Sequence, residues 1–125
     1  MAYLGPVFRW DIFRADLNEV VGREQAGSRR PVLIVSNDAL NRSPLQLVAA
    51  IPLTSLEGKT RKFFPSEIRL PIGTVDPGVT PVGMTHQVRT ISKLRLLEPA
   101  GRLNDPEARE EIEFAILAHF GIEVD

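Results

Sequence analysis

The chain has 125 residues, 43% of them hydrophobic and 25% charged, with a formal net charge of −1 and no cysteine. These values predict one globular domain over residues 1–125, and they exclude wholesale disorder, disulfides and cysteine-based catalytic or metal sites. The apolar runs are too short to span a membrane and the N-terminus lacks a signal-peptide pattern, so we expect a cytoplasmic protein.

The first half of the chain alternates between apolar strands and polar loops. Its first stretch, VFRWDIFRADL, alternates apolar and charged residues in two phases, which indicates a bulge near Ile12 and Phe13. Pro52 cannot donate a hydrogen bond to a strand ladder, so we expect strand pairing to stop there. The predicted elements are a strand at 7–17, a polar loop at 18–30, a buried strand at 31–36, a loop with a short helical turn at 37–44 and an apolar strand at 45–51.

The second half adds further short strands and ends in a helix. Asn104 or Asp105 is the expected N-cap, Pro106 occupies the first turn, and Gly121 ends the helix. About six short strands without intervening helices predict a mainly β fold, a small antiparallel barrel with a C-terminal helix. The predicted elements before the helix are an exposed loop or hairpin at 56–65, an edge strand at 66–72, a connection at 73–81 and strands at 81–92 and 93–98.

Charge is divided unevenly along the chain. Residues 23–62 contain seven cations and three anions, a net charge of +4, whereas residues 98–125 contain two cations and eight anions, a net charge of −6. Such a molecule can present a basic face to an anionic ligand. The alternative is a chance partition of solvated charges.

The polar residues at the predicted strand ends limit the chemistry. His86 and His119 lie far apart, and the chain has neither a glycine-rich phosphate or dinucleotide motif nor a Gly-x-Ser-x-Gly motif, so we expect no metal and no cofactor. What remains is a set of arginine, threonine, serine, glutamine and glutamate residues. Such a set can cleave RNA, because the 2′-hydroxyl of RNA attacks the adjacent phosphate and arginine can stabilise the negative charge that develops. DNA lacks that hydroxyl and would be spared.

Four motifs carry a family resemblance. They are RWDIFRADL, VGREQAGSRRPVLIVSND, IPLTS and HQVRTISKLRL, and together they span nearly the whole chain. In content, order and spacing they resemble the MazF/PemK family of toxin ribonucleases. The resemblance implies a small SH3-like barrel of the CcdB/PemK type, with a C-terminal helix, that works as a homodimer.

The resemblance also implies an activity and a site. Family members cut single-stranded RNA at short sequence motifs without a metal, leaving a 2′,3′-cyclic phosphate and a 5′-hydroxyl, and a cognate antitoxin restrains the resulting growth arrest. Arg30 falls on the family's catalytic arginine, which would stabilise the phosphorane and shuttle a proton, and Thr54 falls on its catalytic threonine. An acidic, disordered antitoxin segment is expected over the basic groove. The expected RNA-binding residues are Glu24, Gln25, Ser55, Lys59, Arg61, Gln87 and Arg89, with Thr90 beside them.

Three positions depart from the family pattern, and one of them is Arg23, at a variable loop position where some members have histidine. Trp10 stands where the family often has glycine, so local packing or the dimer edge is expected to differ. His86 stands where an acidic residue is common. We predict that His86 replaces this acid as a catalytic proton carrier, because histidine changes its charge between about pH 5 and 8.

The sequence also leaves open alternative, non-catalytic interpretations of these residues and of the chain. Arg30 as a surface arginine paired with Asp38 or Glu24, Gln87 as a partner of the backbone, and His86 as an ordinary strand histidine are the alternatives for single residues. For the whole chain, the alternatives are a gyrase-poisoning toxin on the same fold and a catalytically inactive SH3-like binding module. The inactive module would not arrest growth when expressed.

Overall fold

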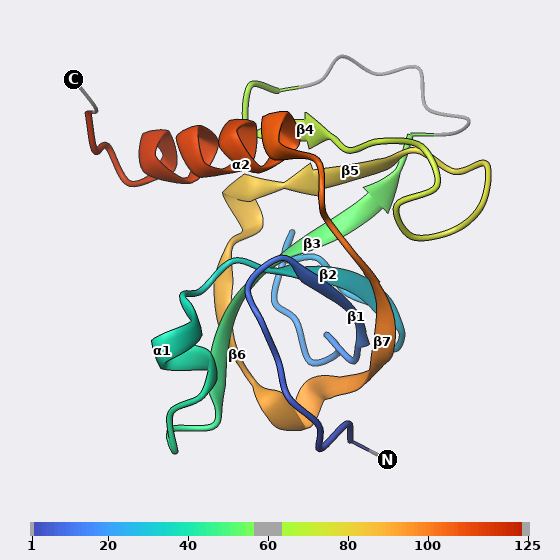
Figure 1. The fold of residues 1–125 in the computed structure, drawn as a ribbon, viewed down its shortest axis with the longest axis vertical. Coiled ribbons are helices and arrows are strands. Elements are labelled where there is room, and N and C mark those ends of the chain that lie inside the picture. Colours follow the sequence, from blue (N-terminus) through green and yellow to red (C-terminus); the bar gives the residue numbers. More distant parts are fainter. Residues whose placement is uncertain (1, 57–63, 124–125) are drawn as a thin grey trace.

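The computed structural model describes residues 2–56 and 64–123 and consists mainly of antiparallel strands, with one long helix at the C-terminal end (Figure 1). The strands are β1 (Asp11–Ala15), β2 (Arg30–Ile34), β3 (Leu47–Ser55), β4 (Glu67–Arg69), β5 (Pro81–Met84), β6 (Arg89–Ser92) and β7 (Leu96–Arg102). The helices are α1 (Asp38–Asn41), α2 (Pro106–His119) and the 3₁₀ turns η1 (Thr85–Gln87) and η2 (Lys93–Arg95).

The strands form one sheet in the order β4-β5-β3-β2-β1-β7, and β6 also pairs with β3. The long strand β3 changes partner along its length: Leu47 to Ala50 pair with β6, and Leu53 to Ser55 pair with β5. β6 continues through η2 into β7, so the chain itself curves from one side of the sheet to the other (Figure 1). In the described residues the sheet ends at β4 and β7, which do not pair with each other, so the sheet does not close into a barrel. The expectation of a mainly β, small-barrel architecture with a C-terminal helix is confirmed.

Strand alternation divides the core into two clusters. In β2, Val32 and Ile34 belong to a cluster with Phe13, whereas Leu33 belongs to a cluster with Ile112 of α2. All five side chains are at most 2% exposed. Successive strand residues point to opposite faces, so both faces of β2 are covered and the strand is held rigidly.

Local signals place α2 as expected. The Asp105 side chain accepts a hydrogen bond from the Ala108 backbone N–H at 3.0 Å, and Pro106 follows at the first position. Gly121, with φ of 70°, follows the helix in the left-handed region. α2 lies beside β4 and β5 (Figure 1). The predicted bulge in β1 is also confirmed, because the register with β7 shifts between Ile12 and Phe13.

The predictions for Pro52 and for the later strands were wrong in part. β3 continues through Pro52, which is aligned with Val32 of β2, so pairing stops only on the other side, where the partner changes from β6 to β5. The predicted strand at 81–92 is broken by η1, and the one at 93–98 begins with η2 and then extends to Arg102. The expected loop or hairpin at 56–65 lies mostly outside the described residues.

Trp10 is built into the core. Its side chain is 7% exposed, and the guanidinium carbons of Arg9 and Arg109 lie 4.7 and 5.4 Å from its ring centroid. Its φ of 76° is in the left-handed region, which favours glycine. The backbone therefore keeps a conformation that suits glycine, and ring burial with two cation–π contacts offsets the strain.

Candidate active site

Arg30 and Thr54 line the same cavity. Arg30 is the first residue of β2 and Thr54 the penultimate residue of β3, and both side chains are half-buried. The cavity has a volume of about 170 Å³. Ser55 also lines it, and so do Arg14 of β1 and Asp76 of the connection before β5. We refer to it as the Arg30 cavity.

Uncharged groups hold the Arg30 guanidinium. Its Nε donates to the Ala26 carbonyl oxygen at 3.2 Å, and Nη1 donates to the Leu53 carbonyl oxygen at 3.4 Å. The Gln25 amide oxygen, in the orientation that satisfies its hydrogen bonds, accepts from Nη2 at 2.7 Å and from Nε at 3.2 Å. Burial lowers the pKa of Arg30 from its ordinary value. These acceptors carry no charge, so within residues 2–56 and 64–123 no hydrogen bond of the guanidinium is with an anion.

The reading of Arg30 as a surface arginine paired with an acidic residue does not hold. Glu24 lies 3.9 Å from Arg89, and Asp38 accepts from the Arg9 backbone N–H at 2.8 Å. That backbone contact is also the main cause that lowers the pKa of Asp38. Arg29, the neighbour of Arg30, forms an ion pair with Glu98. Of the two adjacent arginines, Arg30 is the one that lines the cavity.

Gln87 fastens the loop at 18–29 to η1. Its side-chain oxygen accepts from the Gln25 backbone N–H at 3.2 Å, and its amide nitrogen donates to the Arg23 carbonyl oxygen at 3.1 Å. The alternative reading of Gln87 as a partner of the backbone is thus confirmed. Because Gln25 in turn contacts Arg30, Gln87 supports the residue that orients the guanidinium.

Arg89 joins the same loop from β6. Its Nη1 faces Glu24 at 3.9 Å, and the other Glu24 oxygen accepts from the Val21 backbone N–H at 2.9 Å. The predicted residues Glu24, Gln25, Gln87 and Arg89 therefore gather around one loop. Lys59 and Arg61 lie outside the described residues.

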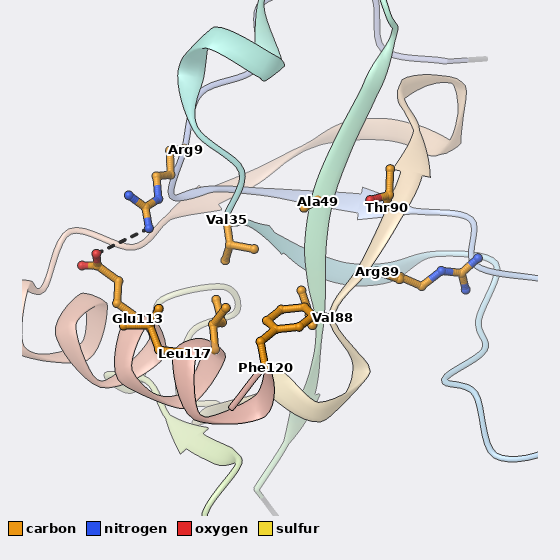
Figure 2. A pocket seen from close by; sticks show the side chains of 10 residues that line it. Arg9, Val35, Ala49, Val88, Arg89, Thr90, Glu113, Leu117 and Phe120 are labelled. Carbon is orange, nitrogen blue, oxygen red and sulfur yellow. Dashed lines mark ion pairs between the residues drawn. The ribbon is translucent and has the colours of Figure 1, made fainter. Parts of the chain in front are cut away.

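Arg89 and Thr90 also border a second cavity of about 450 Å³ under the end of α2. Figure 2 shows its apolar lining of Val35, Val88, Leu117 and Phe120, and the ion pair of Arg9 with Glu113 at 3.5 Å. In this view the Arg89 guanidinium points away from Phe120. Arg89 thus contacts the loop with its guanidinium and borders the cavity with the aliphatic part of its side chain.

His86 is not among the residues that line the Arg30 cavity. Its Nδ1 lies 2.9 Å from the Ser66 hydroxyl oxygen. It lines a third cavity of about 520 Å³, together with His119 of α2 and the apolar residues Phe64, Pro65, Ala115 and Ala118. The structure therefore brings His86 to the helix rather than to Arg30 and Thr54.

Sequence reasoning missed Arg14 and Asp76. Their side chains form an ion pair of 2.8 Å in the wall of the Arg30 cavity. The alternation of charged and apolar residues in β1 was the one available signal for Arg14. Asp76 gave no signal, because its contact with Arg14 joins positions far apart in the chain.

Residues 2–56 and 64–123 contain no group of three or more histidine, cysteine or acidic residues that could hold a metal ion. None of their helices is long and apolar enough to cross a membrane.

Comparison with known proteins gives a consistent result. The profile of the family described as "PemK-like, MazF-like toxin of type II toxin-antitoxin system" matches residues 8–119. Endoribonuclease EndoA of Bacillus subtilis is 36% identical over 111 residues, covering 88% of this chain and 90% of that protein. Endoribonuclease MazF9 of Mycobacterium tuberculosis is 30% identical over 118 residues, covering 91% and 96%.

Solved structures share the fold. MazF from Deinococcus radiodurans superposes with a TM-score of 0.73 at 24% identity, covering 94% of this chain and 97% of that one. A mycobacterial endoribonuclease in complex with its cognate antitoxin superposes with a TM-score of 0.71 at 22% identity, covering 98% and 100%. The profile match and the two endoribonuclease relatives show that this chain belongs to the family of PemK-like and MazF-like toxins of type II toxin–antitoxin systems.

Proposed function

We propose that this chain is a sequence-selective endoribonuclease that cuts single-stranded RNA without a metal, at the Arg30 cavity. The observation that carries the proposal is the shared cavity of Arg30 and Thr54, with Ser55 beside them. A guanidinium held by uncharged groups and two hydroxyls match the needs of a phosphate that gains negative charge. The endoribonuclease relatives support the same activity.

In the proposed reaction the 2′-hydroxyl oxygen attacks the adjacent phosphorus, and the bond from phosphorus to the 5′-oxygen breaks. The products are a 2′,3′-cyclic phosphate and a 5′-hydroxyl. The 2′-hydroxyl loses its proton to solvent water, and solvent returns a proton to the 5′-oxygen. Arg30 stabilises the charge on the five-coordinate phosphorus with its planar fork, and Thr54 positions the phosphate by a hydrogen bond. Burial lowers the pKa of Arg30, but the side chain stays charged near neutral pH.

Substrate choice is assigned to the loop at 18–29 and to Gln87 and Arg89, which hold it. The loop residue Gln25 contacts Arg30, and its neighbour Glu24 faces Arg89. Lys59 and Arg61 are proposed to steer phosphates toward the groove, as cations near a nucleic acid do without reading sequence.

The proposed partners follow from the family. We assign a homodimer in the cytoplasm and a cognate antitoxin whose acidic, disordered segment binds the basic stretch of the sequence at 23–62, which has a net charge of +4. One solved relative is itself described as bound to its cognate antitoxin. A gyrase poison on this fold would not need Arg30 and Thr54 in one cavity, so that alternative is not favoured, and neither is an inactive binding module.

The test is cleavage of a long single-stranded RNA by the purified protein with a chelator present, beside a single-stranded DNA of the same sequence. We expect discrete RNA fragments that end in a 2′,3′-cyclic phosphate and a 5′-hydroxyl, and intact DNA. Loss of RNA cleavage in chelator would contradict the metal-independent reaction. Intact RNA together with inhibited gyrase supercoiling would support the gyrase poison instead.

A further inference from the structure

The two arginines of the Arg30 cavity are held in opposite ways. Arg14 is bound by a carboxylate, that of Asp76, at 2.8 Å. Arg30 is bound by two backbone carbonyls and by the Gln25 amide. Arg14 is therefore neutralised by an anion of the protein itself, whereas in the part of the chain that the structure describes Arg30 has no such ion pair.

Arg14 lies diagonally across the β1–β2 ladder from Arg30. Arg14 is opposite Pro31 and the next residue, Ala15, is opposite Arg30, so the two arginine side chains leave the sheet on opposite faces, and both residues line the Arg30 cavity. The Arg14 side chain is 25% exposed and that of Asp76 is 52% exposed. The Arg14–Asp76 pair thus lies in the wall of the cavity, with its carboxylate accessible to solvent.

Such a pair is poorly explained as a device for stability. An ion pair with one partner half-exposed contributes between about 0 and 1 kcal/mol, and an arginine in a strand interior gives up apolar packing. A substrate phosphate, by contrast, offers a guanidinium the same planar, two-oxygen acceptor as a carboxylate. Asp76 therefore occupies Arg14 with the kind of group that RNA would supply.

We propose that Arg14 forms a second phosphate subsite, which binds a backbone phosphate next to the scissile one, and that Asp76 occupies this subsite until RNA displaces it. The inference rests on the proposed ribonuclease function and extends it to a residue for substrate binding. Arg14 acts on affinity, because it would hold a phosphate next to the scissile one and would not touch the reacting atoms. Asp76 opposes binding, because its carboxylate competes with the phosphate and repels it.

The test uses an RNA oligonucleotide that contains a mapped cleavage site, and measures kcat, KM and the salt dependence of KM for full-length variants. For Arg14→Ala we expect KM to rise about tenfold, since one charge-assisted contact is lost, with kcat within about twofold of wild type. The slope of log affinity against log salt should fall by about 0.7, the value for one phosphate contact on a single strand. Arg14→Lys should keep that slope, because the charge remains.

Asp76→Asn separates the subsite from a merely structural ion pair. If Asp76 competes with RNA, this variant lowers KM while Arg14→Ala raises it. If the pair only supports the fold, both variants move KM in the same direction or leave it unchanged, and that result would overturn the proposal. The opposite signs do not depend on a loss of folding, which would impair both variants.

Arg102→Ala is the matched control. Arg102 forms an ion pair with Asp11 at the same 2.8 Å, but neither residue lines the Arg30 cavity. We expect unchanged KM and an unchanged salt slope. Arg30→Ala is measured in parallel. If it still cleaves RNA, the assignment of cleavage to the Arg30 cavity fails. If it is inactive and Arg14→Ala behaves as wild type, only the second subsite fails.

Discussion

Two cavities contain residues that the sequence marked as catalytic, and they differ in kind. The Arg30 cavity gathers a guanidinium held by uncharged groups, the hydroxyl residues Thr54 and Ser55, and the Arg14–Asp76 pair. The cavity of His86 is lined mainly by apolar groups. Phosphate chemistry needs charge and hydrogen-bond donors aimed at one place, so we propose that the reaction takes place in the first cavity and that His86 takes no part in it.

The largest effect is expected at Arg30 itself. Arg30→Lys keeps the charge but loses the planar fork and the contacts with Ala26 and Leu53, so we expect single-turnover cleavage to slow about 10²- to 10³-fold. Arg29→Lys is the control, since Arg29 forms an ion pair with Glu98 outside the cavity. Equal losses in the two variants would mean that general positive charge, rather than the geometry of Arg30, supports cleavage.

A smaller effect is expected at Thr54. Removing one hydroxyl that contacts a charged phosphate oxygen costs about 10- to 100-fold in the cleavage rate, so Thr54→Ala should fall in that range. Thr54→Ser keeps the hydroxyl and should recover most of the rate. If serine rescues no better than alanine, the role of Thr54 is one of packing.

Substitutions of Gln25 test whether Arg30 needs uncharged hydrogen-bond partners that do not neutralise its guanidinium. Gln25→Ala loses the amide contact at 2.7 Å and should lower kcat about tenfold, with little change in KM, because Gln25 positions Arg30. Gln25→Glu keeps a hydrogen-bond acceptor but adds a carboxylate beside the guanidinium. We expect it to be slower than Gln25→Ala, and a faster rate would show that geometry outweighs charge at this position.

The smallest effect is expected at His86. His86→Gln removes the titrating ring and leaves a polar side chain beside Ser66. We expect the cleavage rate to stay within about twofold of wild type and to keep its dependence on pH between about 5 and 8, where a histidine proton carrier would act. A variant that loses one limb of the pH profile would restore His86 to the reaction.

Local signals in the sequence were enough for some parts of the fold. Asp105 and Pro106 predicted the start of α2, and Gly121 predicted its end. A change in the phase of the apolar and charged alternation predicted the bulge in β1. The break at η1 and the extension of β7 to Arg102 were missed, because long-range pairing decides both. A proline ended a strand in the prediction, yet β3 continues through it by exchanging one partner for another.

The sequence predicted those site residues that lie within the family motifs. Arg30 and Thr54 lie in separate motifs, and the register of β2 with β3 brings them to one cavity. Their supports were less accessible, because the contacts of Gln87 and Asp76 join positions more than 60 residues apart. The motif HQVRTISKLRL drew attention to His86. It could not reveal that His86 lines a cavity together with residues of α2.

The most direct test of this account is the single-turnover cleavage rate of Arg30→Ala beside that of His86→Ala, on the same RNA, at saturating enzyme and with a chelator present. The account predicts that Arg30→Ala loses cleavage and that His86→Ala retains nearly the full rate. Retained cleavage in Arg30→Ala, or loss of cleavage in a folded His86→Ala, would contradict the assignment of the reaction to the Arg30 cavity.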